Sequence, residues 1–237
     1  MLRVRPTRYT SALPELRRLL EDVGLVVTEE GSGWAVLDAG SGRVRLRAVP
    51  AGSPGDGMTS FGVEIREPEA FTRRTRQDGG RASIEDAIGG VRVRITGPDG
   101  FSFLAEPSAH GATCADADRA LAVRMEWLTP DLPGAALALS AIGARPRTAG
   151  APAPATEFTA KNGGVLALRE APVLRGGDLV LEYDGDVGTL ASRLARAGWS
   201  PEVGEAQGRQ GAVVRVPTPD GGEVTILTAP PSHGVEQ

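Results

Sequence analysis

An internal repeat with an offset of about 120 residues is the sequence feature that most constrains the fold of this chain. Segments of the first half match segments of the second half in the same order. The four matches pair residues 4–24 with 123–143, residues 42–50 with 164–172, residues 63–79 with 181–198, and residues 94–100 with 215–221. Because a fixed offset between similar segments indicates duplicated architecture, the 237 residues predict two similar domains. We place the first domain at residues 1–110 and the second at residues 119–232.

The spacing of apolar residues predicts amphipathic helices that end at glycines. In residues 13–23, leucine and valine recur at the spacing of one helix face, and the pattern stops at Gly24. Glycine is the residue expected just past a helix end, because it tolerates the left-handed conformation there. Late in the second half, Asp186 is expected to cap the start of a helix that ends before Gly198.

The strands of the first half alternate arginine with apolar residues. Arginine occupies every second position in residues 43–47, and residues 91–95 repeat this alternation with Arg92 and Arg94. Such a period of two predicts one apolar and one polar face. Pro-Asp-Gly sequences, which begin at Pro98 and again at Pro219, predict tight turns between the last two strands of each domain. The predicted fold class is therefore α+β, with a strand, a helix and three strands in each repeating module.

Composition excludes several classes of protein. A formal net charge of -4 gives no overall positive field for nucleic acid. Cys114 is the only cysteine, which excludes an intramolecular disulfide and a cysteine-rich zinc site. The most apolar helical stretch, residues 135–144, is about half the length of a membrane span, and residues 1–16 lack the apolar run of a signal peptide. We therefore expect a cytoplasmic protein that binds neither nucleic acid nor a membrane.

The order of the modules, the helix that ends in Gly24-Leu25 and the Pro-Asp-Gly turn before the last strand together resemble the vicinal oxygen chelate superfamily. This superfamily includes glyoxalases, bleomycin-resistance proteins and extradiol dioxygenases. The resemblance covers about residues 2–107 and 119–230. It implies a tandem repeat of paired βαβββ modules, whose curled mixed sheets form two cups with the helices outside and the ligand or metal inside.

The metal site of the superfamily is not found at the matching positions of this sequence. The resemblance places a histidine early in the first strand of a module and a glutamate a few residues past the turn glycine. The positions that match are Val4, Ser60, Val123 and Asp178 for the histidine, and Leu104 and Thr225 for the glutamate. A register shift of one residue brings in Arg5 or Arg124, which cannot ligate a cation, and a shift of two brings in Glu106 or Glu223 without a histidine. Since the only histidines, His110 and His233, lie in a connector and near the end of the sequence, we expect no metal and no other cofactor.

Charged and aromatic residues on the polar strand faces are the candidates for binding a ligand. Guanidinium groups suit carboxylate or phosphate, and an indole suits a flat aromatic ring. The predicted ligand-binding residues are Arg5, Arg45, Glu64, Arg92, Arg94, Arg124, Trp127 and Glu182. The alternatives are that the arginines form ion pairs on a solvated face, that the two glutamates are their partners, and that the tryptophan packs in the core or between the halves.

Three functions remain open from the sequence. The main prediction is a metal-independent binding protein of the glyoxalase and bleomycin-resistance type, which sequesters a metabolite or an antibiotic and has no assigned catalytic residue. The first alternative is an enzyme of the same superfamily, of the lyase, isomerase or dioxygenase-like type, that uses Glu64, Glu182 or an unrecognised metal site. The second alternative is a non-catalytic scaffold. The expected partner is an anionic or aromatic small molecule, and a homodimer is left open.

Overall fold

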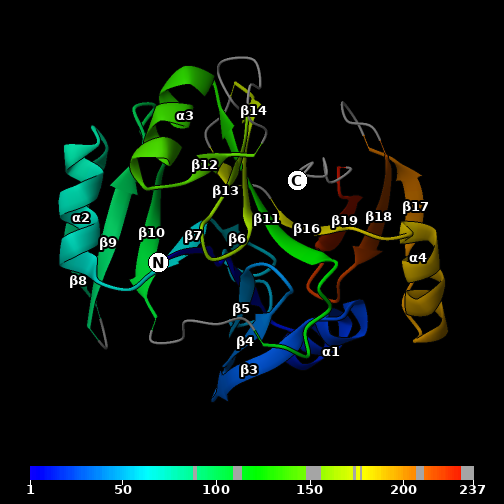
Figure 1. Ribbon diagram of the computed structural model, residues 1–237. Coiled ribbons are helices and arrows are strands. Elements are labelled where there is room, and N and C mark those ends of the chain that lie inside the picture. The colour runs from blue at the N-terminus through cyan, green and yellow to red at the C-terminus, as the bar shows by residue number, and fades with distance from the viewer. Residues whose placement is uncertain are drawn as a thin grey trace.

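The computed structural model describes residues 1–87, 90–108, 114–147, 156–172, 175–176, 178–206 and 211–230, and His110 and His233 lie outside these ranges (Figure 1). The chain forms four successive modules, each with one helix.

The first half contains two modules. The first comprises β1 (Leu2–Val4), β2 (Thr7–Thr10), α1 (Leu13–Val23), β3 (Val26–Gly31), β4 (Trp34–Asp38) and β5 (Arg43–Ala48). The second comprises β6 (Thr59–Ser60), β7 (Gly62–Ile65), α2 (Pro68–Gln77), β8 (Arg81–Ala87), β9 (Gly90–Thr96) and β10 (Ser102–Pro107).

The second half repeats this order. Its first module comprises β11 (Leu121–Thr129), α3 (Leu132–Ala141), β12 (Arg145–Pro146), β13 (Glu157–Thr159) and β14 (Val165–Glu170). Its second module comprises β15 (Arg175–Gly176), β16 (Leu179–Tyr183), α4 (Val187–Arg196), β17 (Glu202–Glu205), β18 (Ala212–Pro217) and β19 (Glu223–Thr228).

The strands form three mixed sheets, which confirms the predicted α+β class. The second half is one sheet of order β12-β13-β14-β11-β16-β19-β18-β17, with β15 paired to β11. The first half divides into a sheet of order β1-β7-β10-β9-β8 and a sheet of order β3-β4-β5-β2-β6. Pro6 separates β1 from β2, and proline has no N–H to donate to a ladder. The matching strand β11 has no such break, and it pairs with both β14 and β16.

The predicted helix boundaries are confirmed. The apolar face of α1 is buried at Leu16, Leu19, Leu20 and Val23, and Gly24 follows in the left-handed conformation with φ of 117°. The Asp186 side chain accepts a hydrogen bond from the Gly188 N–H at the start of α4. No helix among the described residues is long and apolar enough to span a membrane.

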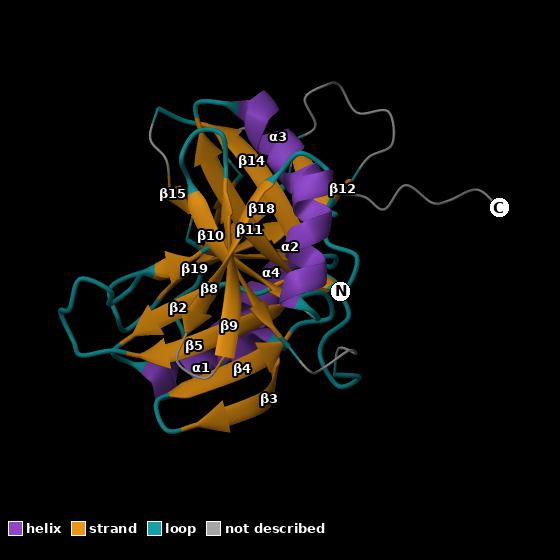
Figure 2. Ribbon diagram, turned by 90° about the vertical axis from the view of Figure 1, so that its left-hand side faces the viewer, coloured by secondary structure: helices purple, strands orange, loops and turns teal. Residues whose placement is uncertain are grey.

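The helices pair across the two halves. Helix α1 contacts α4, and α2 contacts α3, so the latter two lie side by side in both views (Figures 1 and 2). The Trp199 indole N–H donates to Asp22 over 2.8 Å, and Arg193 donates to the Val23 carbonyl over 2.8 Å. The buried apolar residues of both halves form one core cluster. The division into domains at residues 1–110 and 119–232 stays a prediction.

The two Pro-Asp-Gly turns contact the opposite half in matching ways. Asp220, in the turn between β18 and β19, accepts hydrogen bonds from Arg8 on β2. Asp99, in the turn between β9 and β10, accepts from the Trp127 indole and the Thr129 hydroxyl on β11. Each turn aspartate therefore fixes a strand of the other half, β2 in the first half and β11 in the second.

Candidate functional site

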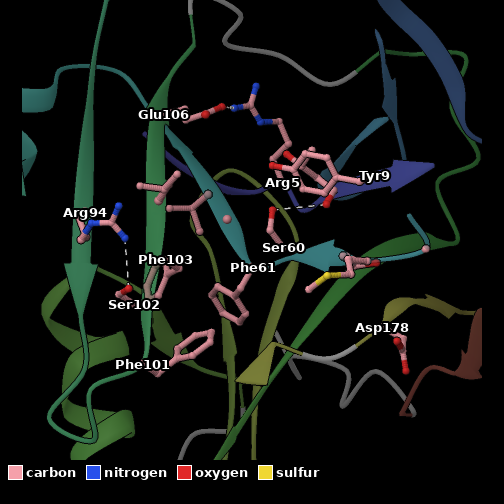
Figure 3. Close-up of a pocket in the computed structure, with 17 residues that line it drawn as sticks. Arg5, Tyr9, Ser60, Phe61, Arg94, Phe101, Ser102, Phe103, Glu106 and Asp178 are labelled. Atoms are coloured by element: carbon pink, nitrogen blue, oxygen red, sulfur yellow. Dashed lines mark hydrogen bonds and ion pairs between the residues drawn. The ribbon is translucent and has the colours of Figure 1, made fainter. Parts of the chain in front are cut away.

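A cavity of about 480 Å³ lies where the two sheets of the first half separate, and Asp178 of the second half also lines it (Figure 3). Strands β2 and β6 of one sheet line it on one side, and β7, β9 and β10 of the other sheet line it opposite. Its aromatic and polar lining includes Phe61, Phe101, Phe103, Tyr9, Ser60 and Ser102, and its charged lining consists of Arg5, Arg94, Glu106 and Asp178. We call this cavity the aromatic pocket.

Three phenylalanine rings pack together at one end of the aromatic pocket. The ring centroids of Phe61 and Phe103 are 4.8 Å apart, and those of Phe61 and Phe101 are 5.8 Å apart with perpendicular planes. Behind them, Phe101 lies 5.0 Å from the ring of Trp127, which is fully buried. Trp127 is therefore placed between the halves, as in the packing alternative, and its ring does not line the aromatic pocket.

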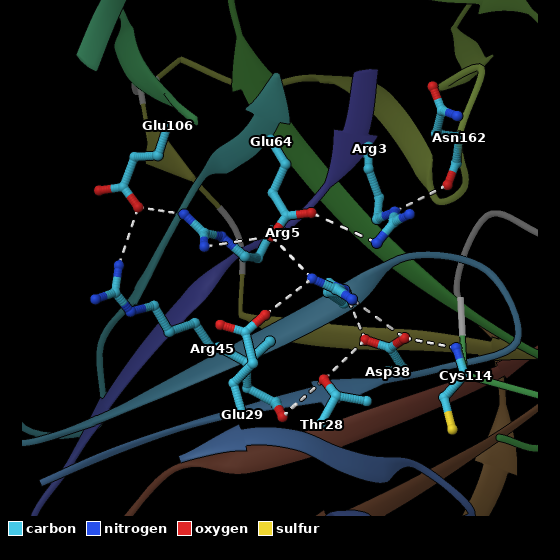
Figure 4. A network of polar contacts seen from close by, with 12 residues as sticks. Arg3, Arg5, Thr28, Glu29, Asp38, Arg45, Glu64, Glu106, Cys114 and Asn162 are labelled. Atoms are coloured by element: carbon cyan, nitrogen blue, oxygen red, sulfur yellow. Dashed lines mark hydrogen bonds and ion pairs between the residues drawn. The ribbon is translucent and has the colours of Figure 1, made fainter. Parts of the chain in front are cut away.

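An arginine–glutamate pair borders the other end of the aromatic pocket. Arg5 donates to Glu106 Oε2, and Arg45 Nη1 donates to the same oxygen over 3.0 Å (Figure 4). Burial lowers the pKa of Arg5, while the charges of Glu64 and Glu106 oppose this shift. Because a guanidinium stays charged even after a large shift, Arg5 presents a fixed cation to the cavity.

Glu64, a predicted ligand-binding residue, is enclosed by guanidinium groups. Its carboxylate lies 3.3 Å from Arg5, 3.6 Å from Arg3 and 3.6 Å from Arg43, and its side chain is buried (Figure 4). Asp38 holds Arg43 in place over 2.6 Å. Glu64 therefore acts as the anion of an ion-pair cluster rather than as a carboxylate open to the aromatic pocket.

The remaining predicted arginines of the first half are also paired with glutamates. Arg92 and Arg94 on β9 both contact Glu85 on the neighbouring strand β8. Arg94 also donates to Ser102 over 3.3 Å, at the lining of the aromatic pocket. The hydrogen bond to Glu85 is the largest cause that raises the pKa of Arg94.

In the second half the equivalent arginine is surrounded by three glutamates. Arg124 Nη1 lies 2.7 Å from Glu182 and 2.8 Å from Glu157, and its Nε lies 3.3 Å from Glu126. Burial by itself lowers the pKa of Arg124, but the charges of these glutamates outweigh it and raise the pKa. Arg147 binds the other oxygen of Glu182 over 2.7 Å. Ion pairs thus occupy this face of β11.

The residues present do not fit the metal site that the fold family implies. Arg5, between β1 and β2, and Arg124, on β11, occupy matching positions in the repeat, and each binds the carboxylates that lie near it. Within the described part of the chain, no group of three or more His, Cys, Asp or Glu side chains is placed to hold a metal ion. We therefore derive no chemical step through a metal.

The pattern of the sequence singled out Arg5, but not the aromatic pocket beside it. Phe61, Phe101 and Phe103 come from strand β10 and from residues next to β7 and β10, which approach only in the folded chain. The sequence marks Glu106 only as a metal-ligand position in a shifted register. The spacing of Phe101 and Phe103 two residues apart is the one local signal for a shared aromatic face.

Comparisons with known proteins identify the fold. No family model matches the sequence, and no curated protein matches it either. Homoprotocatechuate 2,3-dioxygenase from Arthrobacter globiformis is similar in structure, with a TM-score of 0.62 and 16% identity, over 96% of this chain and 78% of that chain. The 2,3-dioxygenase LapB from Pseudomonas sp. KL28 has a TM-score of 0.61 and 13% identity, over 98% of this chain and 93% of that chain. For 2,2',3-trihydroxybiphenyl 1,2-dioxygenase from Sphingomonas wittichii strain RW1 the values are 0.57 and 12%, over 96% of this chain and 89% of that chain.

These likenesses show that the chain has the vicinal oxygen chelate fold, as the sequence resemblance predicted. They also correct the functional prediction. The main prediction of a metal-independent binding protein that sequesters a ligand is wrong, because the similar structures named above are dioxygenases and favour the enzyme alternative.

Proposed function

We propose that this chain is an enzyme with the vicinal oxygen chelate fold that acts on a small oxygenated aromatic compound by proton transfer. The observation that carries the proposal is the aromatic pocket, which combines three phenylalanine rings with the ion pair of Arg5 and Glu106. The names of the similar structures, which are dioxygenases of homoprotocatechuate and trihydroxybiphenyl, support the substrate class.

The phenylalanine end of the pocket would bind the ring of the substrate. A volume of about 480 Å³ lies within the range of small-molecule sites. The perpendicular arrangement of Phe61 and Phe101 presents ring edges and faces at one place, and aromatic contacts of this kind contribute about 0.5–1.5 kcal/mol beyond the area they bury. Tyr9 and Ser60 also line the pocket and supply hydroxyl groups there.

The charged end of the pocket would carry the chemistry. A substrate hydroxyl that donates to Glu106 transfers its proton to that carboxylate, and the oxyanion that remains lies next to the Arg5 guanidinium. Return of that proton from Glu106 to a ring carbon of the oxyanion gives the keto tautomer of the substrate, so atoms and charge balance without a further reactant. Arg45 donates to the same oxygen of Glu106 as Arg5 does and thereby helps to position the carboxylate.

The second half would serve mainly to support the first. Its Arg124 is bound by three glutamates, and its aspartate turn fixes β2 of the first half through Arg8. This arrangement agrees with a scaffold role for that half alone. A cytoplasmic location is part of the same proposal.

A panel of catechols and hydroxylated aromatic acids tests this function. We expect saturable binding and conversion of at least one compound. Liquid chromatography measures the conversion, and dissolved oxygen is measured in parallel to detect any oxygen consumption. In Glu106→Gln we expect kcat to fall by about 10²- to 10⁴-fold, the usual contribution of a positioned acid or base. Glu202→Gln, an exposed site on β17, is the matched control.

Two results would count against the proposal. Wild-type turnover in Glu106→Gln would exclude the proton-transfer role, and the absence of both binding and conversion across the panel would exclude the substrate class. Thermal unfolding of each variant checks that the comparison is made between folded proteins.

A further inference from the structure

A second hollow of about 790 Å³ lies in the first half, and it shares Glu106 with the aromatic pocket. Its charged and aromatic lining consists of Trp34, Arg45, Arg47, Asp86, Arg92 and Glu106. Apart from Glu106, none of these residues lines the aromatic pocket. We call it the arginine hollow.

Strand pairing places the main residues of the arginine hollow on one sheet face. Arg45 and Arg47 are two residues apart on β5, so their side chains leave the same face. Trp34 on β4 lies directly opposite Arg47, and Tyr9 on β2 lies opposite Arg47 from the other side. Side chains directly opposite one another lie close enough to touch, so Arg47 stands between two aromatic residues.

The guanidinium groups of the arginine hollow are incompletely paired. Arg45 shares the carboxylate of Glu106 with Arg5, and its Nε is buried without a hydrogen-bond partner. Arg92 shares Glu85 with Arg94. Arg47 is exposed and forms no ion pair with any residue in the described ranges. The lining of the hollow thus has three guanidinium groups and two carboxylates, Asp86 and Glu106, and Glu106 is also bound by Arg5 outside the hollow.

We propose that the arginine hollow is a binding site for a small oxyanion, a phosphate group that is either free or esterified to a flat aromatic ring. Guanidinium groups bind such oxygens through forked, charge-assisted hydrogen bonds, and Arg47 donates no hydrogen bond to another residue of the described ranges. The Arg45 guanidinium lies over the Trp34 ring at 6.0 Å from its centroid, and the aromatic part of an ester would pack beside it against the same ring. This proposal does not depend on the reaction in the aromatic pocket.

Calorimetric titration of the full chain with inorganic phosphate and with phenyl phosphate tests the proposal. We expect saturable binding that weakens as sodium chloride is raised, because exposed charges are screened by salt. Arg47→Gln should weaken binding by about tenfold or more, and Arg92→Gln should weaken it as well. Arg73→Gln, which removes an exposed arginine of α2 outside the hollow, should leave the affinity unchanged.

The two probes distinguish the sources of the oxyanion. Binding of both at similar affinity supports a site for free phosphate, while binding of phenyl phosphate at least tenfold tighter supports an aryl ester that packs on Trp34. The proposal is overturned if neither probe saturates, or if Arg47→Gln and Arg92→Gln bind as the wild type does. Turnover by the aromatic pocket is measured in the same variants, so that a failure of this site is separated from a failure of the proposed enzyme.

Discussion

The ion pair of Arg8 and Asp220 allows the strength of the contact between the halves to be predicted. Arg8 Nη2 lies 2.8 Å from Oδ1 of Asp220 and Arg8 Nε lies 3.2 Å from Oδ2, so the pair is bidentate. Both side chains are almost completely excluded from solvent, at 1% and 0% exposure. Removing one partner of such a pair leaves the other charge buried, and Arg8→Met should therefore lower the free energy of unfolding by about 3–5 kcal/mol.

The double variant Arg8→Met/Asp220→Asn isolates the cause of this loss. It removes both charges, so the free energy of unfolding should recover part of the loss seen in the single variant. Urea denaturation at pH 7 measures each value. Arg17→Met is the matched control, because Arg17 forms ion pairs with Glu21 and Glu30 at the surface, where a pair contributes at most about 1 kcal/mol. If Arg8→Met costs no more than Arg17→Met, the buried pair does not hold the halves together.

Two further predictions concern buried charges. Arg124→Met should lower the free energy of unfolding by about 3–5 kcal/mol, because it removes the guanidinium shared by three glutamates. Arg169→Met, at the exposed edge of the same cluster, is the control and should lower it by less than about 1 kcal/mol in the same urea assay. For Asp220, burial by itself raises the pKa, but hydrogen bonds from Arg8, Thr218 and Thr10 outweigh it and lower the pKa below the ordinary value of 3.8. The ionised Asp220 therefore contributes its full stabilisation above pH 3.8, and this contribution is lost as the pH falls through the lower pKa of the folded state. Acid unfolding followed by circular dichroism should therefore show that the stability of Asp220→Asn depends less on pH than the stability of the wild type.

The local part of the fold was predictable from the sequence. The end of α1 at Gly24, the cap of α4 at Asp186 and the two Pro-Asp-Gly turns follow from conformational preferences of single residues, and all are confirmed. The order of modules followed from the repeat. The class of function was not predictable in this way. That prediction depended on the missing metal ligands, and the likeness to dioxygenases contradicts it.

Contacts between distant segments could not be predicted. The alternation of arginines on β5 and β9 indicated which face carries charge, but the partner of each arginine depends on tertiary packing. Arg5 meets Glu106 from 101 residues away, and Arg8 meets Asp220 from 212 residues away. No period or motif encodes such pairs, so the sequence could not distinguish ion-pairing residues from ligand-binding ones.

The position of the aromatic pocket follows from one difference between the halves. Arg5 and Arg124 match in the repeat, and the next residue is Pro6 in the first half but Met125 in the second. Met125 continues the ladder of β11 with β14, and Arg124 pairs with both β14 and β16, so the second half stays one sheet. Pro6 has no N–H for such a ladder, and there the first half separates into two sheets, with the aromatic pocket between them. Of the two matching arginines, Arg5 therefore borders a cavity in the first half, and Arg124 lies in a closed ion-pair cluster in the second half. For this reason the site in the first half is the better candidate for chemistry.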